Sequence, residues 1–245
     1  TTDWGECIIW NPHTAEKITT LTDHTNKVTE VAWHPTGDLI ATATSWDGTC
    51  VIWNPHTAER ITTLTGRTGW VTDIAWHPDG TRIATASSNG TCIIWQPDTG
   101  ERILALTGHT ASVNGVAWHP EGTLVATSSN DRTCIIWNPH TAEKLTTLTG
   151  HTRAVTGLAW HPTGDLIATA DASGLIRISH LDGTLERAFI SVRPRVPGVE
   201  SYASWTSEGL DVLEGEAWRV LRIPEPGGGS RRLELPGLSY EPPTD

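Results

Sequence analysis

The segment Trp118–Ala159, WHPEGTLVATSSNDRTCIIWNPHTAEKLTTLTGHTRAVTGLA, decides the fold because it recurs along the chain. Its first Trp has counterparts at Trp33, Trp76 and Trp160, and consecutive copies are 42 or 43 residues apart. A period of this length is the signature of an array of one structural module. We therefore expect the chain to consist of copies of a single module.

Each copy contains four short runs that suit extended backbone, separated by residues that favour turns. No stretch shows helical periodicity, and β-branched residues are frequent, so four strands are expected per copy. The third run is apolar on both faces, as a sheet between two other sheets requires. Sheets stacked in this way close radially, so the sequence predicts an all-β propeller of four-stranded blades. In the quoted copy and just before it, the runs are Val113–Trp118, Leu124–Ser128, Thr133–Trp137 and Lys144–Thr149.

Residues at fixed places in the repeat resemble the WD40 family. Gly108-His109 precedes the first strand, and Asn138 stands where the family usually has the Asp of its Trp-Asp pair. In that family a His, a Ser or Thr, an Asp and a Trp form a hydrogen-bonded tetrad that ties each blade together. The resemblance implies two such structural tetrads, His24, Thr42, Asp47 and Trp53 in the first copy and His109, Thr127, Asp131 and Trp137 in the third.

The second and fourth copies depart from this pattern. Arg67 and Asn89 stand where the second copy should have its His and Asp. The fourth copy keeps His151 and Thr169, but Ser173 and Ser179 replace the Asp and the Trp. No complete tetrad is expected in either copy.

The WD40 resemblance covers roughly residues 1–190, and residues 191–245 are expected to form a degenerate last blade and a tail. Trp205 and the four residues after it are in register with Trp-His-Pro-Thr-Gly of the fourth copy. The later strands of this fifth copy are expected at 210–213, 217–223 and 231–235. Because the first residues enter the repeat at its third strand, the count is five full units plus a leading half unit, and it leaves open whether the ring is complete. We expect one domain, 1–245, since members of an array cannot bury their faces alone, and a piece of a larger protein.

Composition limits the partners and the compartment. A formal net charge of −11 with only 17 Lys plus Arg argues against binding to nucleic acid or to anionic lipid. No apolar run is long enough to span a membrane, and no signal-peptide pattern opens the sequence. The cysteines occupy one position of successive copies, too far apart to pair, and free thiols fit a reducing compartment, so we expect the cytoplasm. They are Cys7, Cys50, Cys92 and Cys134.

No strong catalytic signature occurs, so neither an enzyme nor a cofactor is expected. Four histidines, His34, His77, His119 and His161, nevertheless repeat at one position and could form a metal-binding ring. Equivalent positions on neighbouring blades lie too far apart to share a zinc ion. We favour the interpretation that each is a turn residue copied with its repeat.

Near-identical copies differ mainly at positions that WD40 propellers place on one face, around the channel mouth. The turns of the opposite face, such as residues 54–57, are also exposed and scarcely vary, which argues against simple drift. Trp46 and Trp70 stand where other copies have small or polar residues, and Trp is enriched at interface hot spots. We expect a partner-binding surface, the variable face, formed by Asn26, Lys27, Glu30, Trp46, Trp70, Asp73, Ser88, Ser112, Asn130 and Arg153.

The sequence therefore predicts a non-catalytic propeller that binds a protein or other macromolecule at this face; it predicts no oligomeric state. Similar arrays are attached to nucleotide-switched NTPase modules in bacterial and fungal self-defence proteins, so the resemblance implies a ligand-sensing part of a larger protein. Two alternatives stay open. One is an architectural ring that mediates assembly, and the other is a catalytic propeller, for which only Glu30 and Asp73 would offer acids at the channel mouth.

Overall fold

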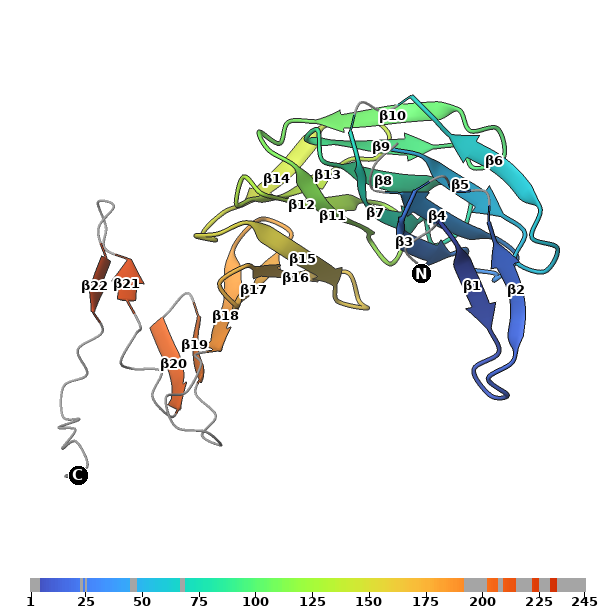
Figure 1. Cartoon of the computed structure of the whole chain (residues 1–245). Coiled ribbons are helices and arrows are strands. Elements are labelled where there is room, and N and C mark those ends of the chain that lie inside the picture. Colours follow the sequence, from blue (N-terminus) through green and yellow to red (C-terminus); the bar gives the residue numbers. More distant parts are fainter. Residues whose placement is uncertain are drawn as a thin grey trace. The chain divides into compact units, whose positions relative to one another are not determined.

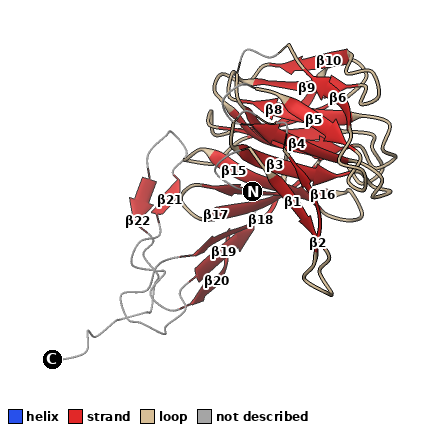
Figure 2. Cartoon of the chain, turned by 45° about the vertical axis from the view of Figure 1, so that its right-hand side comes forward, coloured by secondary structure: helices blue, strands red, loops and turns tan. Residues whose placement is uncertain are grey.

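The computed structural model describes residues 5–22, 24, 26–44, 48–66 and 69–191, together with the backbone of later strands at 202–206, 209–214, 222–224 and 230–232. The chain divides into two compact units, Thr1–Glu186 and Arg187–Asp245. In these described residues every regular element is a strand and none is a helix (Figure 2). The predicted all-β fold is confirmed.

The first unit is a row of antiparallel sheets, each running in sequence order from its inner to its outer strand (Figure 1). A two-stranded hairpin, β1 (Cys7–Trp10) and β2 (Lys17–Leu21), precedes blade 1, which comprises β3 (Val28–Trp33), β4 (Ile40–Thr44), β5 (Cys50–Trp53) and β6 (Arg60–Leu64). Blade 2 comprises β7 (Val71–Trp76), β8 (Ile83–Ser87), β9 (Thr91–Trp95) and β10 (Arg102–Thr107), and blade 3 comprises β11 (Val113–Trp118), β12 (Val125–Ser129), β13 (Cys134–Trp137) and β14 (Lys144–Leu148). Blade 4 contains β15 (Val155–Trp160), β16 (Leu166–Asp171), β17 (Leu175–His180) and the start of β18 (Leu185–Ser191).

The core lies between successive blades. The first strands of neighbouring blades lie beside each other, β3 beside β7, β7 beside β11 and β11 beside β15. The third strands of blades 1 and 3, β5 and β13, are buried at every position, as predicted for a sheet covered on both faces. The four cysteines are buried and none of them forms a disulfide, as the repeat spacing predicts.

A repeated contact joins each blade to the next, and we call it the inter-blade clamp. His77, just after β7, directs Nε2 to the carbonyl of Gly122 in blade 3 at 3.2 Å, and its ring packs edge-on against Trp118 with centroids 4.6 Å apart. Trp118 in turn donates Nε1–H to the carbonyl of Ala75 at 3.1 Å. Gly122 has φ +73°, and a Cβ there would lie 2.1 Å from His77 Nε2, so glycine is needed for the approach. The same clamp recurs as His34 with Gly80 and Trp76, and as His119 with Gly164 and Trp160.

The repeated histidines are turn residues, as expected, and three of the four, His34, His77 and His119, also make an inter-blade contact that the sequence did not predict. The amide of Glu121 donates to His119 Nδ1 at 3.1 Å, so the proton sits on Nε2, which donates to Gly164 at 3.1 Å. The partner is 45 residues away, on the next blade. Nothing in one copy of the repeat reveals a contact that forms only when two copies stack.

The second unit differs from the predicted fifth copy. The end of β18 pairs with β19 (Tyr202–Thr206), and β19 pairs with β20 (Gly209–Glu214), close to the expected second strand. However, β21 (Arg222–Pro224) pairs with β22 (Ser230–Arg232) in a separate two-stranded sheet. The predicted fifth four-stranded sheet is therefore not formed by the described strands. Most of the predicted third strand, 217–223, and part of the predicted fourth strand, 231–235, lie outside the described residues.

Candidate protein-interaction face

In blades 2, 3 and 4, the loop before the first strand meets the turn after the second strand. In blade 2, the amide of Trp70 donates to Ser88 Oγ and the amide of Ser88 donates to the carbonyl of Trp70, both at 2.9 Å. In blade 3, the amide of Asn130 donates to the carbonyl of Ser112 at 2.9 Å. These backbone contacts bring together residues that the sequence marks as variable and that lie up to 18 positions apart.

Polar side chains of this region also connect neighbouring blades. Asp73 accepts the amide of Val116 in blade 3 at Oδ2, at 2.8 Å. Asn114 donates from Nδ2 to Asn130 Oδ1 and to the carbonyl of Val155 in blade 4, both at 2.8 Å. Sequence reasoning did not single out Asn114. The signal was present, because it is the one Asn at a position occupied by Thr29, Thr72 and Thr156 in the other copies.

Two carboxylates on neighbouring blades influence each other. Burial and, to a smaller extent, the charge of Asp73 together raise the pKa of Glu30 to about 7. Burial also raises the pKa of Asp73, although the amides of Val116 and Ile74 donate to its carboxylate and oppose this shift. The pair therefore carries less than two negative charges near neutral pH. A cationic group of a partner would favour full ionisation of both acids.

The predicted binding residues differ in accessibility. Trp70 has 53% of its surface exposed, although its backbone is held by Ser88. An indole of this size in water is available as an anchor for a partner. Trp46 lies outside the described residues. Of the others, Lys27, Asn130 and Arg153 are exposed, whereas Asn26, Glu30, Asp73, Ser88 and Ser112 are half-buried.

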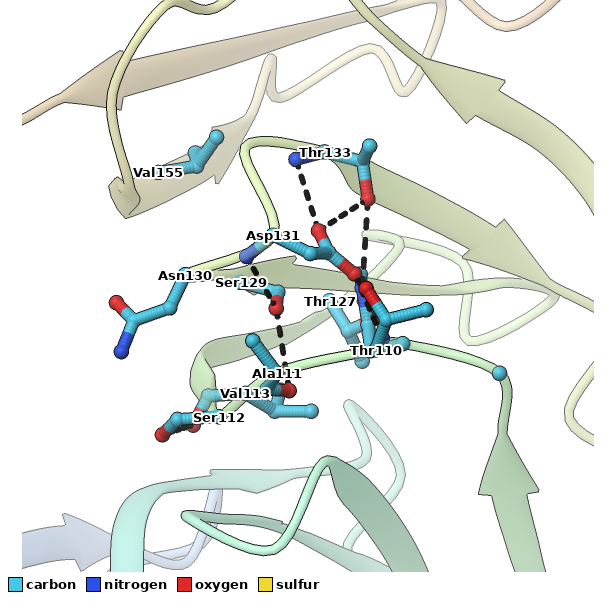
Figure 3. A network of polar contacts seen from close by, with 12 residues as sticks. Thr110, Ala111, Ser112, Val113, Thr127, Ser129, Asn130, Asp131, Thr133 and Val155 are labelled. Carbon is cyan, nitrogen blue, oxygen red and sulfur yellow. Dashed lines mark hydrogen bonds and ion pairs between the residues drawn. The ribbon is translucent and has the colours of Figure 1, made fainter.

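In blade 3, four side chains form one directed chain of hydrogen bonds that ends at Asp131. Figure 3 shows the further contacts of Asp131 with Thr133 and Ser129. Trp137 donates Nε1–H to Thr127 Oγ1 at 2.8 Å, and Thr127 donates to His109 Nε2 at 2.8 Å. His109 then donates Nδ1–H to Asp131 Oδ2 at 2.8 Å. Asp131 also accepts from Thr133, and these donors hold its pKa at about 2 although burial alone would raise it.

The tetrad positions of blades 1 and 2 are only partly described. His24 Nε2 lies 2.5 Å from Thr42 Oγ1, which also accepts Trp53 Nε1–H at 2.7 Å, whereas Asp47 lies outside the described residues. In blade 2, Trp95 donates to Thr85 Oγ1 at 2.9 Å, and Thr85 turns its hydroxyl to the carbonyl of Ile93. Arg67, which replaces the His, also lies outside the described residues.

Blade 4 corrects the expectation that its His has lost its acidic partner. His151 Nδ1 lies 3.0 Å from Asp171 Oδ2, and its Nε2 lies 2.8 Å from Thr169 Oγ1. Asp171 ends β16, two residues before Ser173, the position that aligns with Asp131. Burial lowers the pKa of His151 despite this carboxylate, so the imidazole is neutral and donates one proton to a charged acid. The position that aligns with Asp131 does not supply the acid in blade 4. Asp171, two residues earlier in the hairpin, contacts the His151 ring instead.

The chain of Thr, His and Asp in blade 3 has the residue types of a nucleophilic relay but not its accessibility. Thr127 has no exposed surface, and its hydroxyl is already engaged by His109 and Trp137. Only 1% of the His109 side chain is exposed. Among the described residues, no group of three or more His, Cys, Asp or Glu side chains could hold a metal ion.

Comparison with known families agrees with the geometry. The model for the WD domain, G-beta repeat, matches residues 15–54, 58–96, 100–138 and 142–178, which is more than half of the chain. The chain therefore belongs to the WD40 family, whose repeats generally form non-catalytic protein-interaction propellers. A search of curated proteins found no match. No helix in the described part of the chain is long and apolar enough to cross a membrane.

Proposed function

We propose that this chain binds a protein partner through the variable face and carries out no chemistry of its own. The observation that carries the proposal is the convergence of the variable residues. Loops of blades 2, 3 and 4 are tied to the turns of their own blades, and Asp73 and Asn114 connect one blade to the next. A surface braced in this way loses little conformational entropy when a partner binds, which favours affinity.

Trp70 is the proposed anchor of this surface. Its indole is exposed while its amide and carbonyl are both fixed by Ser88, so the side chain projects from a rigid position. Trp46 is the second proposed anchor on the strength of the sequence alone. Together with Lys27 and Arg153 at the exposed rim and the acids Glu30 and Asp73, the face offers a large apolar group among charges of both signs. This composition suits a protein partner better than a polyanion.

The finer role is ligand sensing or scaffolding within a larger cytoplasmic protein. The four cysteines that form no disulfide support a reducing compartment, because disulfides form and persist in oxidising ones. The likeness of the near-identical repeats to arrays attached to NTPase modules supports the sensing role.

The test is capture of partners from extract of the source cells with the full chain and two matched variants. Trp70→Ala removes the proposed anchor. Trp10→Ala removes an indole that is equally exposed, at 55%, but lies at the end of β1 beside a constant Asn-Pro-His-Thr turn. We expect Trp70→Ala to lose at least one protein that both the wild type and Trp10→Ala retain, with a weakening of tenfold or more on titration of that protein.

Two results would contradict the proposal. One is a set of captured proteins that both variants retain equally, because the variable face would then not be the binding surface. The other is a large fall in the thermal unfolding midpoint of Trp70→Ala, because the indole would then be a packing residue.

A further inference from the structure

Two Asn-Gly pairs occur in the chain, Asn89-Gly90 and Asn114-Gly115. Asparagine loses its side-chain amide more readily before glycine than before other residues, because no Cβ shields the next backbone nitrogen from the Asn carbonyl carbon. The first pair lies in the turn between β8 and β9, and the second lies within β11. Only the pair in the turn has the geometry that this reaction needs.

The side chain of Asn89 folds over the backbone nitrogen of Gly90. Its Oδ1 accepts the amide of Thr91 at 3.0 Å and the hydroxyl of Thr91 at 2.7 Å. A side chain that reaches the amide two residues ahead must pass over the peptide between them, so Cγ of Asn89 lies on the side of the Gly90 nitrogen. The two donors also draw electron density from the carbonyl, and they are placed to stabilise the negative charge that develops on Oδ1 during attack.

Gly90 and the solvent supply what else the reaction requires. Gly90 has φ +88° and no side chain beside its nitrogen. Its amide donates to the carbonyl of Ser87 at 3.2 Å, so this one hydrogen bond must open before the nitrogen can attack. Asn89 is exposed, and water therefore reaches the reacting carbon.

Asn114 is held away from this chemistry. Its Nδ2, the nitrogen that would leave as ammonia, donates to Asn130 Oδ1 and to the carbonyl of Val155, both at 2.8 Å. The extended backbone of β11 also keeps the side chain off the following peptide, because successive residues of a strand point to opposite faces. The same dipeptide is therefore protected in blade 3 and unprotected in the turn of blade 2.

Blade 3 shows that the turn at residue 89 suits a carboxylate. Asp131 occupies the equivalent position, and its Oδ1 accepts the amide and the hydroxyl of Thr133 at 3.0 and 2.6 Å. The backbone amide of this residue donates to a serine hydroxyl two residues earlier in both blades, Ser87 in blade 2 and Ser129 in blade 3. An aspartate at position 89 would keep every one of these hydrogen bonds.

We propose that Asn89 is a site of spontaneous deamidation, which gives blade 2 the acidic turn residue of blade 3. The Gly90 nitrogen loses its proton to solvent and bonds to Asn89 Cγ, while the Cγ–Nδ2 bond breaks and Nδ2 takes up a proton and leaves as ammonia. One water molecule then opens the resulting succinimide. Its oxygen bonds to Cγ, the bond from Cγ to the Gly90 nitrogen breaks, and that nitrogen regains its proton. The net change replaces the side-chain NH₂ by OH, which ionises to a carboxylate.

The turn favours aspartate over isoaspartate as the product. Isoaspartate forms when water attacks the backbone carbonyl carbon instead, and it adds one carbon to the main chain. A Cβ at Gly90 would lie only 3.1 Å from the carbonyl oxygen of Ala111 in blade 3, so a longer main chain has little room. The new charge follows Ser88, whose hydroxyl accepts the amide of Trp70, and so it alters the variable face. The reaction itself needs only the turn and does not rest on the proposed function.

The test compares both Asn-Gly pairs in one sample of the full chain. The protein is incubated at pH 8 in water enriched in oxygen-18, and peptide mapping by mass spectrometry measures the label at residues 89 and 114. Electron-transfer fragmentation separates aspartate from isoaspartate. We expect residue 89 of the folded chain to react about tenfold faster than residue 114 or more, because only its carbonyl oxygen has donors in place. In guanidinium-unfolded chain the two pairs should react at similar rates.

Two variants test the cause and the product. Thr91→Val removes the hydroxyl that donates to Asn89 Oδ1 and should slow the reaction several-fold, whereas Thr133→Val makes the same change in blade 3 and should leave the rate at residue 89 unchanged. Asn89→Asp is the expected product, and it should unfold at a urea concentration no lower than that of the wild type.

The proposal fails if residue 89 of the folded chain reacts no faster than residue 114, a result that needs no variant. It also fails if Thr91→Val and Thr133→Val react at the same rate. Isoaspartate as the main product, or unfolding of Asn89→Asp at a lower urea concentration, would mean that the turn is not suited to an acid. Circular dichroism of each variant shows whether a changed rate reflects a changed fold.

Discussion

Blades 3 and 4 place a carboxylate against the same face of a buried histidine, but they take it from different positions of the repeat. In blade 3 the acid is Asp131, in the turn after β12. In blade 4 it is Asp171, the last residue of β16. A carboxylate can therefore reach Nδ1 of the blade histidine from more than one position along the hairpin.

The two acids also differ in how much of the surrounding turn they hold by hydrogen bonds. In blade 3 the turn is held by two side chains, since Ser129 Oγ accepts the amide of Asp131 and Asp131 accepts the amide of Thr133. In blade 4, Asp171 alone accepts the amides of Ser173 and Leu175 and the hydroxyl of Ser173, while also accepting from His151. Its side chain has no exposed surface, against 10% for Asp131. In blade 4 one residue, Asp171, therefore accepts the turn hydrogen bonds that Ser129 and Asp131 share in blade 3.

The sharpest test of this comparison replaces each acid by alanine. Asp171→Ala should lower the free energy of unfolding by about 3 kcal/mol, because a buried imidazole and two amides lose their acceptor together. Asp131→Ala should cost about 2 kcal/mol, because water can reach part of its site and Ser129 still holds the turn. Urea unfolding of the full chain at pH 7 measures both losses.

Two further variants of blade 4 serve as controls. Ser173→Ala should cost less than about 1 kcal/mol, because it removes only one hydroxyl that donates to Asp171. Asp165→Ala, on the exposed turn before β16, should stay within about 0.5 kcal/mol of the wild type. If Ser173→Ala were as harmful as Asp171→Ala, the histidine partner would have been assigned to the wrong residue.

Much of this fold could be predicted from one chain because the repeat supplies its own comparison. Four aligned copies show which positions are constant, and so the strands of blade 3 were placed within a residue or two of β11 to β14. The same alignment gave the wrong residue in blade 4, because it compares positions along the sequence and not positions in space. The acid that contacts His151 is Asp171, two residues before the aligned Ser173. The inter-blade clamp could not be predicted for a different reason. The partners of His77 belong to the next copy, and the contact depends on the direction in which the blades stack.

Acid pH offers a second way to sharpen the comparison. The pKa of Asp131 is about 2 in the folded chain, below its ordinary value of 3.8, so the folded state binds fewer protons than the unfolded state between these pH values. This contribution is complete above about pH 4 and disappears as the pH falls through 2. We expect a loss of about 1–2 kcal/mol, after allowance for solvent screening at its partly exposed site.

The measurement is the difference in unfolding free energy between the wild type and Asp131→Asn at intervals from pH 6 to pH 2. The difference should be constant above pH 4 and shrink below it. Asp171→Asn should show a difference that shrinks in the same direction, because hydrogen bonds also lower the pKa of Asp171. A difference that does not change with pH for either variant would mean that the carboxylates are not charged in these networks.

The smallest expected effect comes from the turn that follows each acid. Arg132 has φ +72° in blade 3, and Gly174, at the equivalent position of blade 4, has φ +86°. Both residues close the turn in the same way, with their amides donating to the carbonyls of Ser129 and Asp171. A side chain at positive φ costs about 1–2 kcal/mol, and part of this is offset because glycine makes the unfolded chain more flexible. Arg132→Gly should therefore stabilise the chain by about 0.5 kcal/mol, and Gly174→Ala should destabilise it by about 1 kcal/mol.

Arg132→Ala separates the backbone from the charge, because it removes the exposed guanidinium and keeps the Cβ. If backbone strain is the cause, Arg132→Ala should unfold at the same urea concentration as the wild type, and Arg132→Gly should unfold at a higher one. Equal stabilisation by both would assign the effect to the lost charge beside Asp131. Destabilisation by Arg132→Gly would mean that the two turns are not equivalent, and that blade 3 holds Arg132 in this conformation without strain.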